Sequence, residues 1–221
     1  YHEMGVWQSL YERWIATGKC KGIWQTEIGF CPFPNYYPNA YLRGLYWALT
    51  HQWDEPDKYK LFWYALWGAG PNAKSCLSTG GQERVLTAHG QRAAAMTQLL
   101  GGSTLEAFTQ FRLDYPLPFQ LNEDKPAAMG FRAGRDTVLA FILDEAAQAK
   151  HPAIGVTLPN RSHRPATVEW ADVEGNLHPL TFEYTNGMLR IQFPAEKLDA
   201  AVARDYGHAV RFAIGYLRVR D

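Results

Sequence analysis

The chain has 221 residues, of which 47% are hydrophobic and 20% are charged, and its formal net charge is zero. This composition is typical of a globular protein of one or two domains, and its balanced charge gives no attraction toward nucleic acid or an acidic membrane surface. No apolar stretch approaches the ~20 residues that a membrane-spanning helix needs. We therefore expect neither nucleic acid nor a membrane as a partner.

The first hundred residues alternate between helical and strand patterns. The sequence predicts helices near 2–17, 39–53 and 87–100, the second with Asn39 as N-cap, and strands at 22–27 and 61–68. Both strands are uninterrupted apolar runs, which is typical of parallel strands buried on both faces under helices. This part of the chain is also rich in aromatic residues, which serve either core packing or a sugar-binding cleft.

After Gly102 the pattern changes to short alternating segments separated by turns. The strongest hairpin signal in the chain is the Asn186–Gly187 pair between two such segments. About seven short strands at this spacing favour an antiparallel β-sandwich. We therefore divide the chain into residues 1–102, of α/β class, and residues 103–221, of all-β class.

A single acidic residue, Glu27, stands at the end of the first predicted strand in the segment GIWQTEIGF. Functional groups gather at the carboxyl ends of parallel strands, and Trp67 occupies the matching end of the second strand. A salt-bridged structural role for Glu27 and a packing role for Trp67 are the alternatives.

Residues 20 to 70 resemble the last two β/α units of the clan A glycoside hydrolases, through GIWQTEIGF, the helix that follows, and the aromatic strand LFWYALWG. The resemblance implies a partial (β/α)8 TIM barrel in residues 1–102, followed by the β-sandwich of residues 103–221. It also implies retaining hydrolysis of O-glycosidic bonds, with a carbohydrate as the substrate. Glu27 resembles the nucleophile, and Trp67 resembles the aromatic residue beneath the bound sugar.

Further aromatic residues are candidates for substrate binding. Trp63 and Tyr64 lie on the second strand, and Tyr36 and Tyr37 either line the cleft or cap the loop before the helix. The family places its acid/base residue after the fourth strand, whereas the Asn122–Glu123 pair of this chain falls in a predicted turn. The resemblance therefore implies that the acid/base and the N-terminal remainder of the barrel lie upstream, and that this chain alone is inactive.

Two other functions remain open: a non-catalytic carbohydrate-binding or structural protein, and an α/β enzyme that uses Glu27 as a general base on another substrate. The histidines show no metal-ligand spacing, so no metal or cofactor is indicated, and we assign His89 to packing. Cys31 and Cys76 form a disulfide or remain thiols, which imply different compartments. We favour an extracellular or periplasmic location over the cytoplasm.

Overall fold

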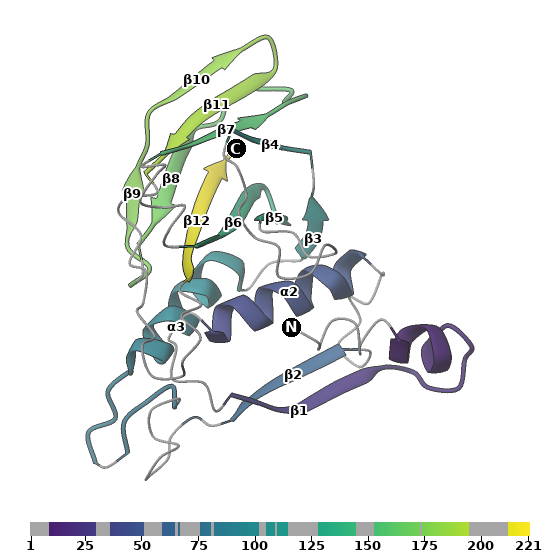
Figure 1. The fold of residues 1–221 in the computed structure, drawn as a ribbon. Coiled ribbons are helices and arrows are strands. Elements are labelled where there is room, and N and C mark those ends of the chain that lie inside the picture. Colours follow the sequence, from purple (N-terminus) through teal and green to yellow (C-terminus); the bar gives the residue numbers. More distant parts are fainter. Residues whose placement is uncertain are drawn as a thin grey trace.

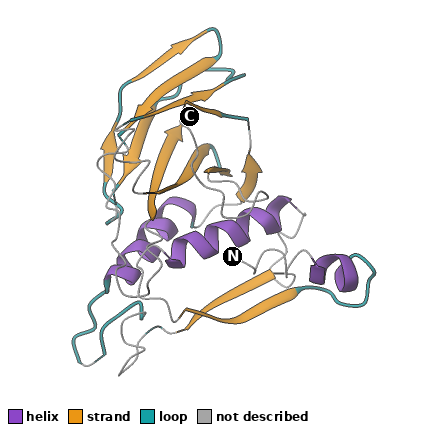
Figure 2. Ribbon diagram, viewed as in Figure 1, coloured by secondary structure: helices purple, strands orange, loops and turns teal. Residues whose placement is uncertain are grey.

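The computed structural model describes residues 9–29, 36–50, 59–64, 66, 76–80, 82–101, 105–108, 110–114, 128–144, 153–172, 174–194 and 212–221. In these residues strands outnumber helices, and the strands form three sheets (Figures 1 and 2). None of the helices within these ranges has the length and hydrophobicity required to cross a membrane.

The N-terminal part contains a small parallel sheet next to two helices. Strands β1 (Ile23–Gly29) and β2 (Tyr59–Tyr64) pair in parallel, and helix α2 (Tyr36–Thr50) connects them in sequence and contacts β2. A short π-helical turn, η1 (Tyr11–Ile15), precedes β1, and helix α3 (Ala88–Leu100) follows β2 and packs against α2. Figure 1 shows the parallel pair below the two helices.

Two larger antiparallel sheets follow α3 in the described chain. The six-stranded sheet has the order β3-β5-β6-β12-β8-β9, and the four-stranded sheet has the order β10-β11-β7-β4. Their bounds are β3 Leu105–Phe108, β4 Arg112–Asp114, β5 Ala128–Ala133, β6 Asp136–Asp144, β7 Ile154–Leu158, β8 Thr167–Ala171, β9 Leu177–Pro179, β10 Phe182–Thr185, β11 Met188–Phe193 and β12 Phe212–Arg220.

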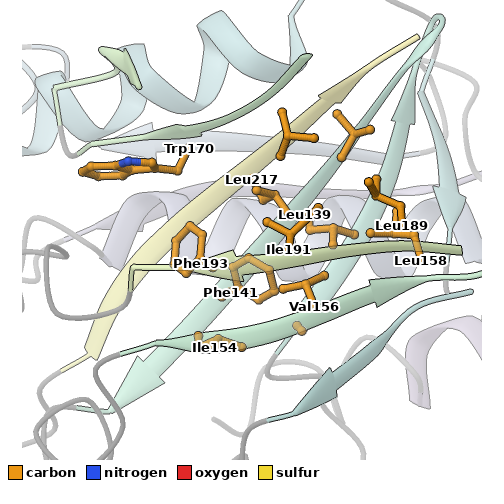
Figure 3. Packing of buried hydrophobic residues seen from close by; sticks show 13 residues of the cluster. Leu139, Phe141, Ile154, Val156, Leu158, Trp170, Leu189, Ile191, Phe193 and Leu217 are labelled. Atoms are coloured by element: carbon orange, nitrogen blue, oxygen red, sulfur yellow. The ribbon is translucent and has the colours of Figure 1, made fainter. Parts of the chain in front are cut away.

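The two antiparallel sheets enclose a hydrophobic core between their facing sides. Phe141 on β6 and Phe193 on β11 come from opposite sheets, and their ring centroids lie 5.0 Å apart (Figure 3). Alternate residues of β7 are buried, as expected for a strand with one face toward the core. Other members of this core are Leu139, Ile154, Val156, Leu158, Trp170, Leu189, Ile191 and Leu217.

A second core lies on the opposite face of the six-stranded sheet, where α2 and α3 pack. Leu42 of α2 and Met96 of α3 share this cluster with Met129 and Phe131 of β5. The order of layers is therefore the four-stranded sheet, the six-stranded sheet, the helices and the parallel pair. Because the six-stranded sheet is covered on both sides, its central strands β5 and β6 are buried almost throughout their described residues.

The expected fold class, a partial (β/α)8 TIM barrel followed by a sandwich, is wrong. The described structure is mainly antiparallel β-sheet, and its only parallel pairing is the two-stranded β1–β2 sheet. The error came from reading uninterrupted apolar runs as doubly covered parallel strands. Here Trp24 and Phe62 in those runs are 54% and 44% exposed, and the doubly covered strands belong to an antiparallel sheet.

Some local predictions are confirmed by the structure. Asn186 and Gly187 have φ angles of 52° and 75° and join β10 to β11 as a two-residue hairpin loop, with Thr185 paired to Met188. These positive φ values are typical of a type I′ turn. Helix α3 falls within the predicted range and buries His89, in agreement with a packing role. Helix α2 begins at Tyr36 rather than near Asn39.

Candidate functional site

The predicted nucleophile lies in an irregular part of β1. Gln25 pairs with Leu61, and the next pairing joins Ile28 to Trp63, so three steps along β1 match two steps along β2. Thr26 and Glu27 occupy this irregular interval. An extra residue in one strand forms a β-bulge, which increases local twist, and bulges are over-represented next to active sites. Glu27 therefore differs from an ordinary strand residue, because it lies where the regular pairing of β1 with β2 is interrupted.

The same end of the sheet brings together other residues that the sequence predicts for the site. Trp63 pairs with Ile28, and Tyr64 pairs with Gly29, the last residue of β1. Because the strands are parallel, Glu27, Trp63 and Tyr64 lie toward the carboxyl edge, where α/β structures place functional groups. The structure describes these three residues through their backbone and strand pairing.

The remaining predicted residues lie elsewhere or outside the described ranges. Tyr36 and Tyr37 form the first turn of α2, and their side chains are not among the described ones. Trp67, Cys31 and the Asn122–Glu123 pair lie outside the described residues, so their roles stay predictions. Cys76 is buried, with 1% of its surface exposed.

The structure adds an aromatic surface that the sequence reasoning did not single out. The rings of Trp24 on β1 and Phe62 on β2 lie 6.1 Å apart between centroids, with 52° between their planes. Lys60 Nζ lies 4.4 Å from the centroid of the Trp24 ring. We call these three residues the Trp24 platform. The signal that would have revealed it is register, because Trp24 pairs with Lys60 in the parallel sheet.

The exposed rings of the Trp24 platform form a surface that suits a ligand with both apolar and polar parts. About half of the Trp24 side chain and somewhat less of Phe62 remain in contact with water, at the cost of hydrophobic free energy. A flat indole presents a large apolar face with a polar edge, and a nearby ammonium group strengthens the polar character of the surface. Trp24 precedes Glu27 by three residues, or about 10 Å along a strand. An extended polar ligand is long enough to reach both.

Asp172 is a titratable group whose environment the structure explains, in the turn between β8 and β9. Burial raises the pKa of its carboxyl group, but hydrogen bonds from His178, Asn176 and Glu174 outweigh this effect, and the net pKa is lowered. His178 Nε2 lies 2.9 Å from Asp172 Oδ2, and the His178 ring stacks on Trp170. This carboxylate closes the β8–β9 turn.

No cluster of three or more His, Cys, Asp or Glu side chains suited to a metal ion occurs in the described ranges. On the described backbone of the parallel pair, the predicted carboxylate of Glu27 shares the carboxyl edge with the aromatic residues Trp63 and Tyr64. Such a set suits nucleophilic or general-base catalysis by a carboxylate, or the binding of a sugar.

Comparison with family models and with curated proteins gives no match for this chain. These comparisons therefore neither support nor oppose the resemblance to glycoside hydrolases. That resemblance continues to depend on residues 20 to 70 and on the geometry of β1 and β2.

Proposed function

We propose that the protein acts as a retaining glycoside hydrolase in which Glu27 is the nucleophile. The observation that carries the proposal is the register shift that contains Thr26 and Glu27, near the carboxyl edge of a parallel strand whose neighbour contributes Trp63 and Tyr64 to the same edge. Strand positions hold a reacting group more rigidly than loops do, as a nucleophile requires. The Thr-Glu-Ile-Gly segment around Glu27 matches the strand-end pattern that the resemblance supplies.

The reaction takes place in two displacements. The Glu27 carboxylate attacks the anomeric carbon, the bond to the leaving oxygen breaks, and a second carboxyl group gives that oxygen a proton. Water then attacks the glycosyl–enzyme ester, the second group takes the proton of the water, and Glu27 is released as a carboxylate. The second group must lie ~5–5.5 Å from Glu27.

The Trp24 platform supports carbohydrate as the substrate. A pyranose ring has an apolar face of C–H groups that suits an exposed indole, and its hydroxyl groups remain free to bind polar side chains. At about 10 Å from Glu27 along the strand, Trp24 would contact a sugar unit adjacent to the reacting one. The substrate would therefore contain at least two sugar units.

The same platform favours a second candidate, a carbohydrate-binding protein without catalysis. In that case Trp24 and Phe62 provide the binding surface, and Glu27 stabilises the strand edge. Both functions predict that loss of Trp24 weakens carbohydrate binding. Only the hydrolase predicts that loss of the Glu27 carboxylate abolishes turnover.

The test compares Glu27→Gln with Glu83→Gln in the complete gene product, on a panel of 4-nitrophenyl glycosides and oligosaccharides. Glu83 is exposed and undergoes the same chemical change, so it is the matched control. We expect Glu27→Gln to lower kcat on the order of 10⁴-fold with folding retained, because an amide cannot form the ester intermediate. Undiminished turnover in Glu27→Gln contradicts the proposal. Oligosaccharide binding that depends on Trp24, without turnover in any variant, supports the second candidate.

A further inference from the structure

A polar cleft opens at one end of the two antiparallel sheets, away from β1 and β2. It lies between the β5–β6 turn at Gly134–Arg135 and the loop after β7, residues 159–163, with Asp221 at its side. Its volume is about 540 Å³, which falls within the ~300–1,000 Å³ common for small-molecule sites. The cleft is therefore larger than a single small inorganic ion needs.

Positive charge dominates the lining of this cleft. Arg132, Arg135 and Arg161 face one acidic residue of the lining, Asp221. Arg132 also lies 3.5 Å from Glu106, in a pair whose side chains are more than half exposed and hence weakly coupled. In the described part of the chain, Arg135 has no hydrogen-bond or ion-pair partner. Of the three arginines of the lining, Arg161 pairs with Asp221 and Arg132 pairs weakly with Glu106, so three cations face two carboxylates and Arg135 carries the excess positive charge.

Arg161 is held in place before any ligand arrives. Its backbone N–H donates to Gly187 O at 2.8 Å, and its carbonyl accepts from the Tyr184 hydroxyl at 3.1 Å. Its side chain is 10% exposed and forms an ion pair with Asp221. Its Nε is buried and has no hydrogen-bond partner among the described residues.

The charges around Arg161 also favour the binding of an anion in the cleft. Burial lowers its pKa, Tyr184 opposes this effect, and the nearby Arg132 lowers the pKa further. Two guanidinium groups close enough to repel each other are stabilised by an anion between them. Guanidinium groups also match the geometry of carboxylate, sulfate and phosphate groups through paired N–H donors.

We propose that this cleft binds a small polar molecule that carries an oxyanion group, with Arg132, Arg135 and Arg161 holding the anion. The hydroxyl groups of Thr137 and Ser162 and the amide of Asn160 face the remaining volume and suit a hydroxylated body. An acidic sugar has both parts, and a free sulfate or phosphate ion has only the first. This site is independent of Glu27, so the proposal does not rest on the proposed function.

A second reading of the same residues, a Ser-His-Asp relay, does not fit the geometry. Ser162 Oγ lies 2.9 Å from His163 Nδ1, but His163 Nε2 lies 3.5 Å from Asp221 Oδ2. Arg161 already pairs with the Asp221 carboxylate, and the His163 side chain is 57% exposed. We therefore assign Ser162 to the polar wall of the anion site.

The test is an NMR titration of the whole chain, which follows the arginine Nε–H signals while ligand is added. The ligands are D-glucuronate, inorganic sulfate and D-glucose as the neutral counterpart. We expect glucuronate to shift the Arg161 Nε–H signal and to bind at least tenfold more tightly than glucose. Arg135→Gln and Arg132→Gln should each weaken glucuronate about tenfold, as expected for the loss of a charge-assisted hydrogen bond.

The matched control is Arg190→Gln on β11, which removes an exposed arginine that does not line the cleft. Binding of glucuronate that exceeds that of sulfate identifies an acidic small molecule as the ligand. Equal binding of the two identifies a free inorganic oxyanion and retains the anion site. Equal binding of glucose and glucuronate, or an equal loss of affinity in Arg190→Gln and Arg135→Gln, would overturn the proposal.

Discussion

At the scale of single residues, features that depend on adjacent positions were predictable from the sequence, and features that depend on distant positions were not. The Asn186–Gly187 loop was predictable because its conformation depends on two adjacent residues that accept positive φ. The Trp24 platform was not, because it arises when β1 and β2 come into register across a gap of more than thirty positions. Glu27 lies between these cases: its place near the carboxyl end of a strand was readable, although β1 continues to Gly29, and the register shift around Glu27 required the partner strand.

The Asp172–His178 pair makes a prediction about pH at the residue scale. Because the folded pKa of Asp172 is lowered, its contribution to stability is fully present above the unfolded pKa, near 3.8, and is lost as pH falls through the folded value. We expect Asp172→Ala to reduce the free energy of unfolding at pH 7 by about 1–2 kcal/mol. Urea unfolding at neutral and strongly acidic pH measures this effect.

At pH values below the folded pKa of Asp172, the difference between Asp172→Ala and the parent chain should shrink, since the protonated carboxyl group no longer pairs with His178 as an anion. Asp114→Ala, on the exposed strand β4, is the control for removal of a surface carboxylate. A destabilisation by Asp172→Ala that is the same at both pH values would contradict this account.

At the scale of elements, α3 illustrates a helix whose ends were readable from the sequence. Its N-cap is Thr87, whose hydroxyl accepts a hydrogen bond from Gly90 N at 3.2 Å, and the helix stops before Gly101. The same hydroxyl donates to the carbonyl of Cys76, which ties the helix start to the preceding loop. That second contact was not readable, because it joins residues that are eleven positions apart.

Loss of the Thr87 cap should destabilise α3. We expect Thr87→Ala to lower the free energy of unfolding by about 1 kcal/mol or somewhat more, since both hydrogen bonds of the hydroxyl disappear. Thr87→Ser keeps the hydroxyl and should remain within ~0.5 kcal/mol of the parent chain. Chemical denaturation followed by far-UV circular dichroism measures both, and equal stability of the Ala and Ser variants would rule out the capping role.

At the scale of the whole molecule, the layers explain why the barrel prediction failed. The apolar runs of β1 and β2 predicted strands covered on both faces, but Trp24 and Phe62 in these runs are 54% and 44% exposed. In this protein the double cover comes from α2 and α3 on one face of the six-stranded sheet and the four-stranded sheet on the other. Strand order depends on contacts between distant segments, such as β12 between β6 and β8.

The shared core between helices and sheet predicts that they unfold together. Leu42 on α2 is fully buried in the cluster that contains Met129 and Phe131 of β5. Leu42→Ala should therefore cost about 2–5 kcal/mol and should also speed amide hydrogen exchange in β5 and β6. Leu66, which is 57% exposed, gives the matched Leu→Ala control. Faster exchange confined to α2 would show that the helix layer unfolds independently of the sheet.

The central claim is that the Glu27 carboxylate forms a covalent bond to a sugar. The most direct measurement is peptide mass spectrometry of the complete gene product after reaction with 2,4-dinitrophenyl 2-deoxy-2-fluoroglycosides, whose leaving group needs no acid catalyst. We predict one glycosyl adduct, located on Glu27 and absent from Glu27→Gln. An adduct on a different carboxylate that persists in Glu27→Gln would contradict the account.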